Sequence, residues 1–214
     1  MKILIAGANG YTGRILVQKL SQHPVHEPWA MIREESQEIK MEELGVSGSV
    51  VADLEKDLDH TVKGMDGVIF AAGSGSKTGP DKTIDVDQEG AKRLTDACVK
   101  SGVDHFVMLS ARGVDNPSGK IAHYREAKRI ADEYLMKSGL IYTIVRPGRL
   151  NFEQGTGKIE LKRVIENHEG RSISREDVAD VLIKSFDIAE VKNKVFEILS
   201  GKTPIDKAMI SHNL

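Results

Sequence analysis

The sequence predicts a single-domain α/β protein over residues 1–214, with a doubly wound parallel sheet and a small C-terminal lobe. First, short apolar runs alternate with segments of helical periodicity along most of the chain, which is the pattern of a parallel sheet covered by helices. Second, the strongest runs are nearly continuous in apolar residues, as expected for strands that are buried on both faces. Third, the glycine-rich stretch GANGYTG (7–13) joins the first apolar run to the first helical segment.

Seven apolar runs are candidate strands. In chain order they cover residues 2–6, 28–33, 49–53, 67–72, 105–110, 141–146 and 195–200. The second and third runs, PWAMIR and SVVAD, carry the weaker signal. The connections between parallel strands are right-handed, and ligands bind beyond the carboxyl ends of such strands. The functional residues are therefore sought where these runs end.

Four segments between the strands have helical spacing of their apolar residues. They cover residues 11–22, 81–102, 123–139 and 175–187. Gly102 and Gly139 end the second and third of these segments, as expected for helix caps. Residues 147–172 break the alternation with scattered glycines and mixed charge, so we expect a small substrate lobe or lid there.

Composition excludes several classes of protein. The formal net charge is −2, which gives no global electrostatic case for nucleic acid. A single cysteine, Cys98, allows neither a disulfide framework nor a cysteine-based metal site within the chain. No apolar run approaches the ~20 residues of a membrane span, and the N-terminus lacks the pattern of a secretory signal. We expect a cytoplasmic protein with a small-molecule partner and neither nucleic acid nor membrane as partner. The oligomeric state is left open.

Histidine pairs are weak candidates for a metal site. His23 and His26 are close in sequence but lie in a proline-flanked turn, and no carboxylate cluster accompanies them in the sequence. We therefore expect no metal ion.

The glycine stretch is typical of a dinucleotide site. Gly7 can turn the chain sharply out of the strand, Gly10 leaves room for a pyrophosphate, and Gly13 lets the helix pack close to the sheet. The unpaired N–H groups of the helix N-terminus would then face the phosphates. The remaining loop positions, Asn9, Tyr11 and Thr12, are expected to line the same site. A merely tight turn is the alternative.

The ends of the next strands indicate which dinucleotide binds. Arg33 comes first after the second strand, with no acidic residue before it, and a guanidinium can hold the 2′-phosphate of NADP bidentately. NADP is therefore favoured over NAD, although Glu34 and Glu35 weaken the case. Asp53 could accept a hydrogen bond from the adenine amino group or cap a turn. The other expected cofactor contacts are Leu54, Ala71, Ala72 and Gly73.

Tyr124 and Lys128 lie four apart on a predicted helix and so share one face. A free tyrosine has a pKa near about 10, and a neighbouring ammonium lowers that pKa. Such a tyrosine can exchange a proton with a carbonyl oxygen during hydride transfer, and Ser110 could hold the same oxygen. By itself the spacing is weak evidence, because most such pairs are an aromatic ring beside a solvated lysine.

Taken together, the motifs GANGYTG, VADL, FAAG, HYREAK, YTIVRPG and ISREDVADVL resemble the short-chain dehydrogenase/reductase superfamily. The resemblance covers about residues 1–200 and is to atypical members with an extended glycine motif, a group named after NAD(P)-dependent epimerases and dehydratases. It implies a Rossmann fold, a nicotinamide cofactor and tyrosine–lysine chemistry, with Lys128 also reaching the ribose. It further implies that Pro147 and Gly148 lie near the nicotinamide.

Three departures from that family affect the catalytic assignment. Asp87 stands where the family has an active-site asparagine, and a carboxylate there would repel a nearby phenolate. Ser110 is followed by ARG rather than by further hydroxyl residues, so it can be out of register. Only 14 positions separate Ser110 from Tyr124, which is short for the family.

The leading expectation is an NADP-dependent oxidoreductase that transfers hydride to or from a small molecule. A nucleotide-sugar epimerase or dehydratase shares this chemistry but generally has a larger C-terminal domain, whereas a planar acceptor such as a flavin or quinone suits a small lobe. The third possibility is a non-catalytic sensor that binds NADP(H), which Asp87 favours and the Tyr124/Lys128 pair disfavours.

Overall fold

The computed structural model describes residues 1–75 and 79–211. Its strands are β1 (Lys2–Ala6), β2 (Glu27–Ile32), β3 (Gly48–Val51), β4 (Gly67–Phe70), β5 (His105–Leu109), β6 (Ile141–Pro147), β7 (Arg149–Asn151), β8 (Lys158–Lys162), β9 (Ser172–Ser174), β10 (Lys194–Ser200) and β11 (Thr203–Pro204). Its helices are α1 (Tyr11–Ser21), α2 (Glu38–Glu43), α3 (Pro80–Lys82), α4 (Ala91–Ser101), α5 (Ala122–Met136), α6 (Arg175–Lys184) and α7 (Ile205–Ile210). Each of the seven predicted strands has a counterpart, within a few residues at its ends.

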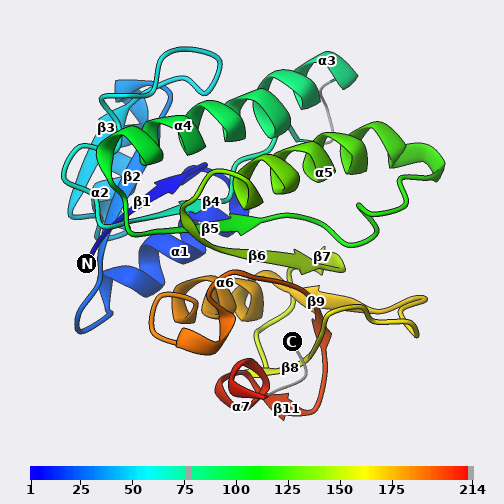
Figure 1. The fold of residues 1–214 in the computed structure, drawn as a ribbon. Coiled ribbons are helices and arrows are strands. Elements are labelled where there is room, and N and C mark those ends of the chain that lie inside the picture. Colours follow the sequence, from blue (N-terminus) through cyan, green and yellow to red (C-terminus); the bar gives the residue numbers. More distant parts are fainter. Residues whose placement is uncertain (76–78, 212–214) are drawn as a thin grey trace.

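Within the described residues, the main sheet has nine strands in the order β11-β8-β10-β6-β5-β4-β1-β2-β3. Seven neighbouring strands run parallel, in the sheet order β10-β6-β5-β4-β1-β2-β3. Strand β8 pairs antiparallel with both β10 and β11. Helices α4 and α5 cover one face of this sheet, while α1 and α6 cover the other (Figure 1). The predicted doubly wound α/β fold is thus confirmed.

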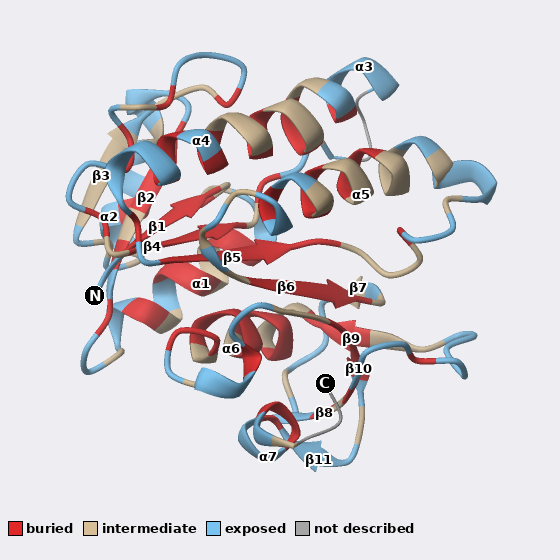
Figure 2. Cartoon of the chain, viewed as in Figure 1, coloured by how far each residue is buried: buried red, intermediate tan, exposed pale blue. Residues whose placement is uncertain are grey.

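The two faces explain the unbroken apolar runs. In β1, Ile3 and Ile5 join the core beneath α1 and α6, whereas Leu4 and Ala6 join the core beneath α4 and α5. Successive side chains of a strand point to opposite faces, so a strand covered on both sides is apolar at every position. The central strands are accordingly buried along their length (Figure 2).

The segment between β4 and α4 differs from the continuous helix that its spacing predicts. A short α3 is followed by a π-helical segment over Thr83–Gly90, and only then does α4 begin. The close approach of Gly90 to Leu54 leaves no room for a Cβ there, since one would lie 2.9 Å from the Leu54 Cβ. The wider π-turn buries Asp87 completely, and such turns are frequent at functional sites. At its other end α4 stops at Gly102, which has φ +67° and caps the helix as predicted.

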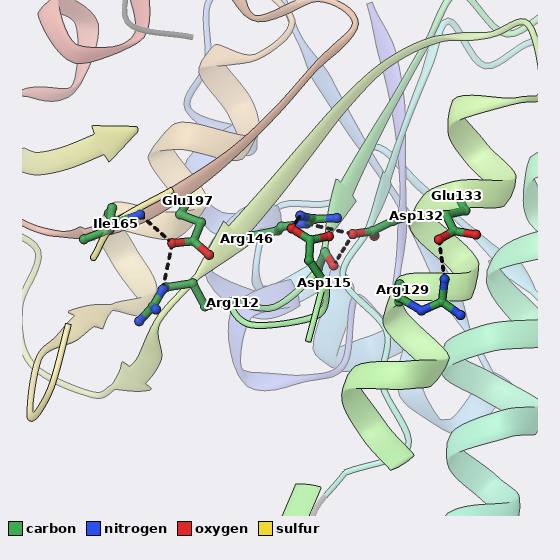
Figure 3. A network of polar contacts seen from close by, with 9 residues as sticks. Arg112, Asp115, Arg129, Asp132, Glu133, Arg146, Ile165 and Glu197 are labelled. Atoms are coloured by element: carbon green, nitrogen blue, oxygen red, sulfur yellow. Dashed lines mark hydrogen bonds and ion pairs between the residues drawn. The ribbon is translucent and has the colours of Figure 1, made fainter. Parts of the chain in front are cut away.

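The expected small lobe, residues 147–172, divides between two sheets. It contains β7 and β8 and ends at the start of β9; β8 extends the main sheet, whereas β7 pairs parallel with β9 in a separate two-stranded sheet. The backbone N–H of Ile165 and the Arg112 Nε each donate to Glu197 Oε2 at 2.8 Å, which fastens the lobe to β10 (Figure 3). No helix among the described residues is both long enough and apolar enough to cross a membrane.

Candidate active site

A cavity of about 940 Å³ opens at the carboxyl ends of the parallel strands. The glycine loop after β1, the ends of β2, β4 and β5, and the first turns of α5 line it. Among the described residues that line it are the cations Arg33, Lys128 and Arg175, and none is an aspartate or glutamate. In a chain with a formal net charge of −2, this distribution makes the cavity suited to anionic ligands.

The glycine loop has the shape that a diphosphate requires. Gly7 has φ +85°, and a Cβ there would lie 2.6 Å from the Ala72 Cα, so only glycine lets the loop pass the end of β4. A Cβ at Gly13 would collide with the Gly7 carbonyl oxygen, so its role is close packing of α1 on the loop. Gly7 and Gly10 line the cavity and Gly13 does not.

The N-terminus of α1 is open toward this cavity. Its N-cap residue, Gly10, provides no side-chain cap, and its first turn contains no acidic residue. Unpaired N–H groups and the positive end of the helix dipole therefore remain available to an anion. Asn9 is oriented by Arg14, whose Nη2 donates to the Asn9 Oδ1 at 2.8 Å. Asn9, Tyr11 and Thr12 all line the cavity, so the loop residues fit a dinucleotide diphosphate.

Only some of the residues expected to bind the adenosine half of the cofactor line the cavity. The exposed Arg33 lines the cavity, and its backbone N–H donates to the Gln37 Oε1 at 3.1 Å. Leu54 lines it too, but Asp53 does not; the Asp53 Oδ1 accepts from the backbone N–H of Glu55 at 3.0 Å and so stabilises a local turn. On the other side of the cavity the lining includes Ala71, Ala72 and Gly73 from the end of β4.

Lys128 is 2% exposed at the floor of the cavity. Its Nζ lies 3.2 Å from the Asp87 Oδ1 and 3.4 Å from the carbonyl oxygens of Ala72 and Leu109. Burial opposes the ammonium charge, but Asp87 and Tyr124 outweigh it, and the pKa of Lys128 is raised. Asp87, which stands where the family has an asparagine, is thus the counter-ion of Lys128. The Asp87 Oδ2 also accepts a hydrogen bond from the backbone N–H of Ser74 at 2.8 Å.

Tyr124 is half-buried in α5 and lines the cavity, with the Lys128 Nζ 5.9 Å from its ring centroid. Burial raises the pKa of Tyr124; Lys128 lowers it, and the carboxylates of Asp87 and Asp132 raise it further. The net direction is upward, which differs from the lowered pKa expected from the lysine alone. The reason is that burial of the phenol, which the sequence spacing does not reveal, disfavours the phenolate more than the Lys128 ammonium favours it, and the two carboxylates add to the effect of burial.

Ser110 is turned toward a buried carboxylate. Its Oγ donates to the Asp132 Oδ2 at 2.8 Å, the same oxygen to which the Arg146 Nε donates at 3.0 Å. Arg146 also donates through Nη1 to the Asp115 Oδ2 at 2.9 Å, so the chain of contacts reaches the surface (Figure 3). Because its hydroxyl proton points at Asp132, Ser110 offers a lone pair to the cavity in this arrangement.

Asp132 is not among the functional residues that the sequence predicted. It is completely buried, and burial raises its pKa to about 6, with Arg146 and Ser110 offsetting only part of the penalty. A signal was present, because Asp132 follows Lys128 by four positions and therefore lies on the same helix face. What the spacing could not reveal was the pairing with Arg146 from β6.

Pro147 and Gly148 do not line the cavity. The Pro147 carbonyl accepts from the backbone N–H of Arg112 at 3.0 Å, and the Gly148 N–H donates to the Ile198 carbonyl at 3.0 Å. A Cβ at Gly148 would collide with the side chain of Leu199. The missing side chain at Gly148 therefore serves the packing of β6 against β10.

His23 and His26 do have a carboxylate partner, contrary to the sequence analysis. Asp187 lies beside both, with its Oδ1 2.9 Å from the His26 Nε2 and its Oδ2 3.8 Å from the His23 Nε2. The rings stack with centroids 4.4 Å apart and planes 6° apart. An imidazole binds a metal close to the plane of its ring, and these nearly parallel planes do not converge near Asp187, so the arrangement is a stacked pair of rings with a hydrogen bond from His26 to Asp187.

Comparison with known proteins agrees with this geometry. The family model for NAD(P)H-binding proteins matches residues 7–188. The chain is 39% identical over 215 residues to a Bacillus subtilis protein named as the uncharacterized sugar epimerase YhfK, covering 98% of this chain and 99% of that one. Two solved structures are also similar. A candidate NAD-dependent epimerase/dehydratase from Bacillus halodurans has 43% identity, a TM-score of 0.93 and 98% coverage of both chains. The oxidoreductase ylbE from Lactococcus lactis has 30% identity and a TM-score of 0.83, and the match covers 98% of this chain and 95% of that one.

Proposed function

The chain belongs to the NAD(P)H-binding family, as an atypical short-chain dehydrogenase/reductase with a Rossmann fold, and from this premise we propose that it is an NADP-dependent oxidoreductase of a small molecule. The observation that carries the proposal is the cavity itself. The cavity lies at the carboxyl ends of the strands and faces the uncapped N-terminus of α1. Its glycine loop has no room for side chains at Gly7 and Gly13, and none of the described lining residues is a carboxylate.

The preference for NADP rests on Arg33. Arg33 lines the cavity after the end of β2, where the 2′ position of the adenosine ribose is expected. NAD-specific sites place a carboxylate at this position to accept the ribose hydroxyl, and no described residue lining the cavity supplies one. A 2′-phosphate would gain a charge-assisted bidentate partner instead.

In the reductive direction, bound NADPH would supply a hydride, and the acceptor must also take up one proton. Tyr124 is placed to give that proton, because it lines the cavity and carries a phenolic proton near pH 7, although its raised pKa makes it a weaker acid than a free tyrosine. Lys128, fixed by Asp87 and two carbonyls, holds a positive charge beneath the ring. Ser110 donates its own proton to Asp132, so it can accept a hydrogen bond from the hydroxyl that forms on the reduced product.

A planar acceptor suits this site better than a nucleotide sugar. After Pro147, β8, β10 and β11 extend the main sheet and α6 covers one of its faces, so the described residues that are left over the cavity form only a small lobe (Figure 1).

A second candidate is a sensor that binds NADP(H) without turnover, and the Asp87–Lys128 ion pair favours it. In that pair the Asp87 carboxylate offsets part of the lowering that the Lys128 ammonium exerts on the pKa of Tyr124. The sensor and the enzyme make the same prediction for cofactor binding and opposite predictions for turnover.

The first experiment measures binding by titration calorimetry with NADP⁺ and NAD⁺. We expect Arg33→Ala to weaken NADP⁺ binding at least about tenfold and to leave NAD⁺ binding unchanged. Arg163→Ala removes an exposed arginine that does not line the cavity and is the matched control. Equal loss of affinity for both dinucleotides would remove Arg33 from the 2′ position.

The second experiment follows NADPH absorbance with a panel of carbonyls, quinones and flavins. Tyr124→Phe is compared with Tyr134→Phe, which alters a tyrosine on the same helix whose hydroxyl donates to Asp96 at the surface. Loss of about 10²-fold or more in kcat for Tyr124→Phe alone supports tyrosine as the proton donor. Equal turnover in both variants would mean that the stacking of the acceptor on the nicotinamide, and not the proton of Tyr124, accounts for most of the rate. Tight binding without turnover of any acceptor supports the sensor.

A further inference from the structure

Two aromatic rings and an arginine meet at the mouth of the cavity. The Arg175 Cζ lies 4.0 Å from the Phe152 ring centroid and 5.6 Å from that of Tyr11, and the two rings pack edge to face with centroids 5.0 Å apart. Phe152 and Tyr11 remain 72% and 67% exposed. The rings therefore hold the guanidinium by cation–π contact without covering it.

The small parallel sheet explains why these residues meet. β7 and β9 run side by side with Asn151 opposite Ser174, so the next residue of each strand, Phe152 and Arg175, emerges at the same edge (Figure 1). The Arg175 Nη1 donates to the Asn151 carbonyl at 2.9 Å, which fixes the side chain in this position. Tyr11 is added from the first turn of α1.

The guanidinium has no carboxylate partner among the residues that the structure describes. The nearest acids in sequence are turned toward the loop over residues 155–157: the Glu176 Oε2 accepts from the Gly155 N–H at 2.8 Å, and the Asp177 Oδ1 accepts from the Gly157 N–H at 2.7 Å. Burial lowers the pKa of Arg175, which is the direction for a cation that is partly desolvated and not compensated. Of the five N–H donors of a guanidinium, only one is used by the Asn151 carbonyl.

We propose that Arg175 binds an anionic group of the substrate, so that the acceptor is a planar molecule carrying a carboxylate, phosphate or sulfonate. This inference rests on the proposed oxidoreductase function, because Arg175 lines the same cavity as Tyr124 and Ser110. An ionised oxygen pair fits the free edge of a guanidinium bidentately. The cofactor diphosphate is the other possible source of an anion, and the experiment separates the two.

The test compares riboflavin with FMN, which share one ring system and differ by a phosphate. In wild-type protein with saturating NADPH we expect a lower KM for FMN than for riboflavin. Arg175→Gln should raise the KM for FMN at least about tenfold and change the KM for riboflavin less than about twofold. Arg149→Gln removes an exposed arginine of β7 that does not line the cavity, and should match the wild type.

A second readout does not depend on turnover. Flavin fluorescence quenching with the NADP⁺-loaded protein should give tighter binding of FMN than of riboflavin, and Arg175→Gln should abolish this difference. If the protein turns over neither these flavins nor any carbonyl or quinone of the panel but keeps the difference in quenching, the oxidoreductase proposal fails and the anion site stands. Equal changes for both flavins would overturn the anion site, as would no change for either. A tenfold loss of NADP⁺ affinity with an unaltered preference for FMN would assign Arg175 to the cofactor diphosphate instead.

Discussion

The buried carboxylate of Asp132 makes the stability of the protein depend on pH in a direction opposite to that of most acidic residues. It is completely buried, and burial raises its pKa from 3.8 to about 6 despite the Arg146 guanidinium, the Ser110 hydroxyl and the charge of Lys128. In the unfolded chain the carboxyl has its ordinary pKa. Between about pH 4 and pH 6 the folded state therefore binds the proton more tightly than the unfolded state.

The sign and magnitude follow from these two pKa values. The contribution of Asp132 to the free energy of unfolding is fully present below the pKa that the carboxyl has in the unfolded chain. It is lost as pH rises through the pKa that the carboxyl has in the folded protein. A shift of about 2 units at 1.36 kcal/mol per unit corresponds to about 3 kcal/mol over the whole window. From pH 5 to pH 7, which crosses the folded value, the loss is about 1 kcal/mol.

Urea unfolding of wild type and Asp132→Asn at pH 5, 6 and 7 measures this contribution. The fluorescence of the single tryptophan, Trp29 in β2, is the probe. Relative to the variant, the wild type should lose about 1 kcal/mol of unfolding free energy between pH 5 and pH 7. Glu133→Gln is the control, because Glu133 is the neighbour of Asp132 in the chain, is only partly buried and pairs with Arg129 on the same helix (Figure 3). Parallel pH profiles for wild type and Asp132→Asn would refute the argument, and NMR titration of the Asp132 carboxyl tests it directly if the variant does not fold.

Two further substitutions test other parts of the fold. Gly13→Ala would push a Cβ into the Gly7 carbonyl oxygen, so we expect a loss of about 3 kcal/mol in unfolding free energy together with weaker dinucleotide binding. Gly79→Ala is the control, because a Cβ there meets open space and should change neither quantity. Wild-type stability of Gly13→Ala would contradict the packing role. His105 is buried with its pKa lowered from 6.5 to about 4, so its contribution is present above pH 6.5 and is lost as pH falls toward 4, by about 3 kcal/mol in all. His105→Gln should flatten that acid limb in the same urea series, and an unchanged limb would show that other groups cause it.

Local pattern was sufficient for the seven parallel strands of the sheet and for the glycine loop. The alternation of Ile3 and Ile5 with Leu4 and Ala6 between two cores is a property of any strand covered on both faces, so an unbroken apolar run predicts it. The collision that a Cβ would cause at Gly7 involves the end of β4, but the need for bare backbone was readable from spacing alone. The position of Arg33 at the rim of the cavity likewise follows from its place after a strand.

Tertiary structure alone decided the charge balance of the site and what holds its side chains. Asp87 becomes the counter-ion of Lys128 across 41 positions, and Asp132 joins Ser110 to Arg146 from three different elements. Phe152 and Arg175 meet because β7 pairs with β9, and β8 turns into the main sheet instead of forming a separate lid. The physical reason is that periodicity reports whether a residue is buried, which depends on its neighbours along the chain. Which partner a buried residue contacts depends on strand order and register. Strand order and register therefore decide that Tyr124 lies beside a Lys128 ammonium that is already paired with the Asp87 carboxylate.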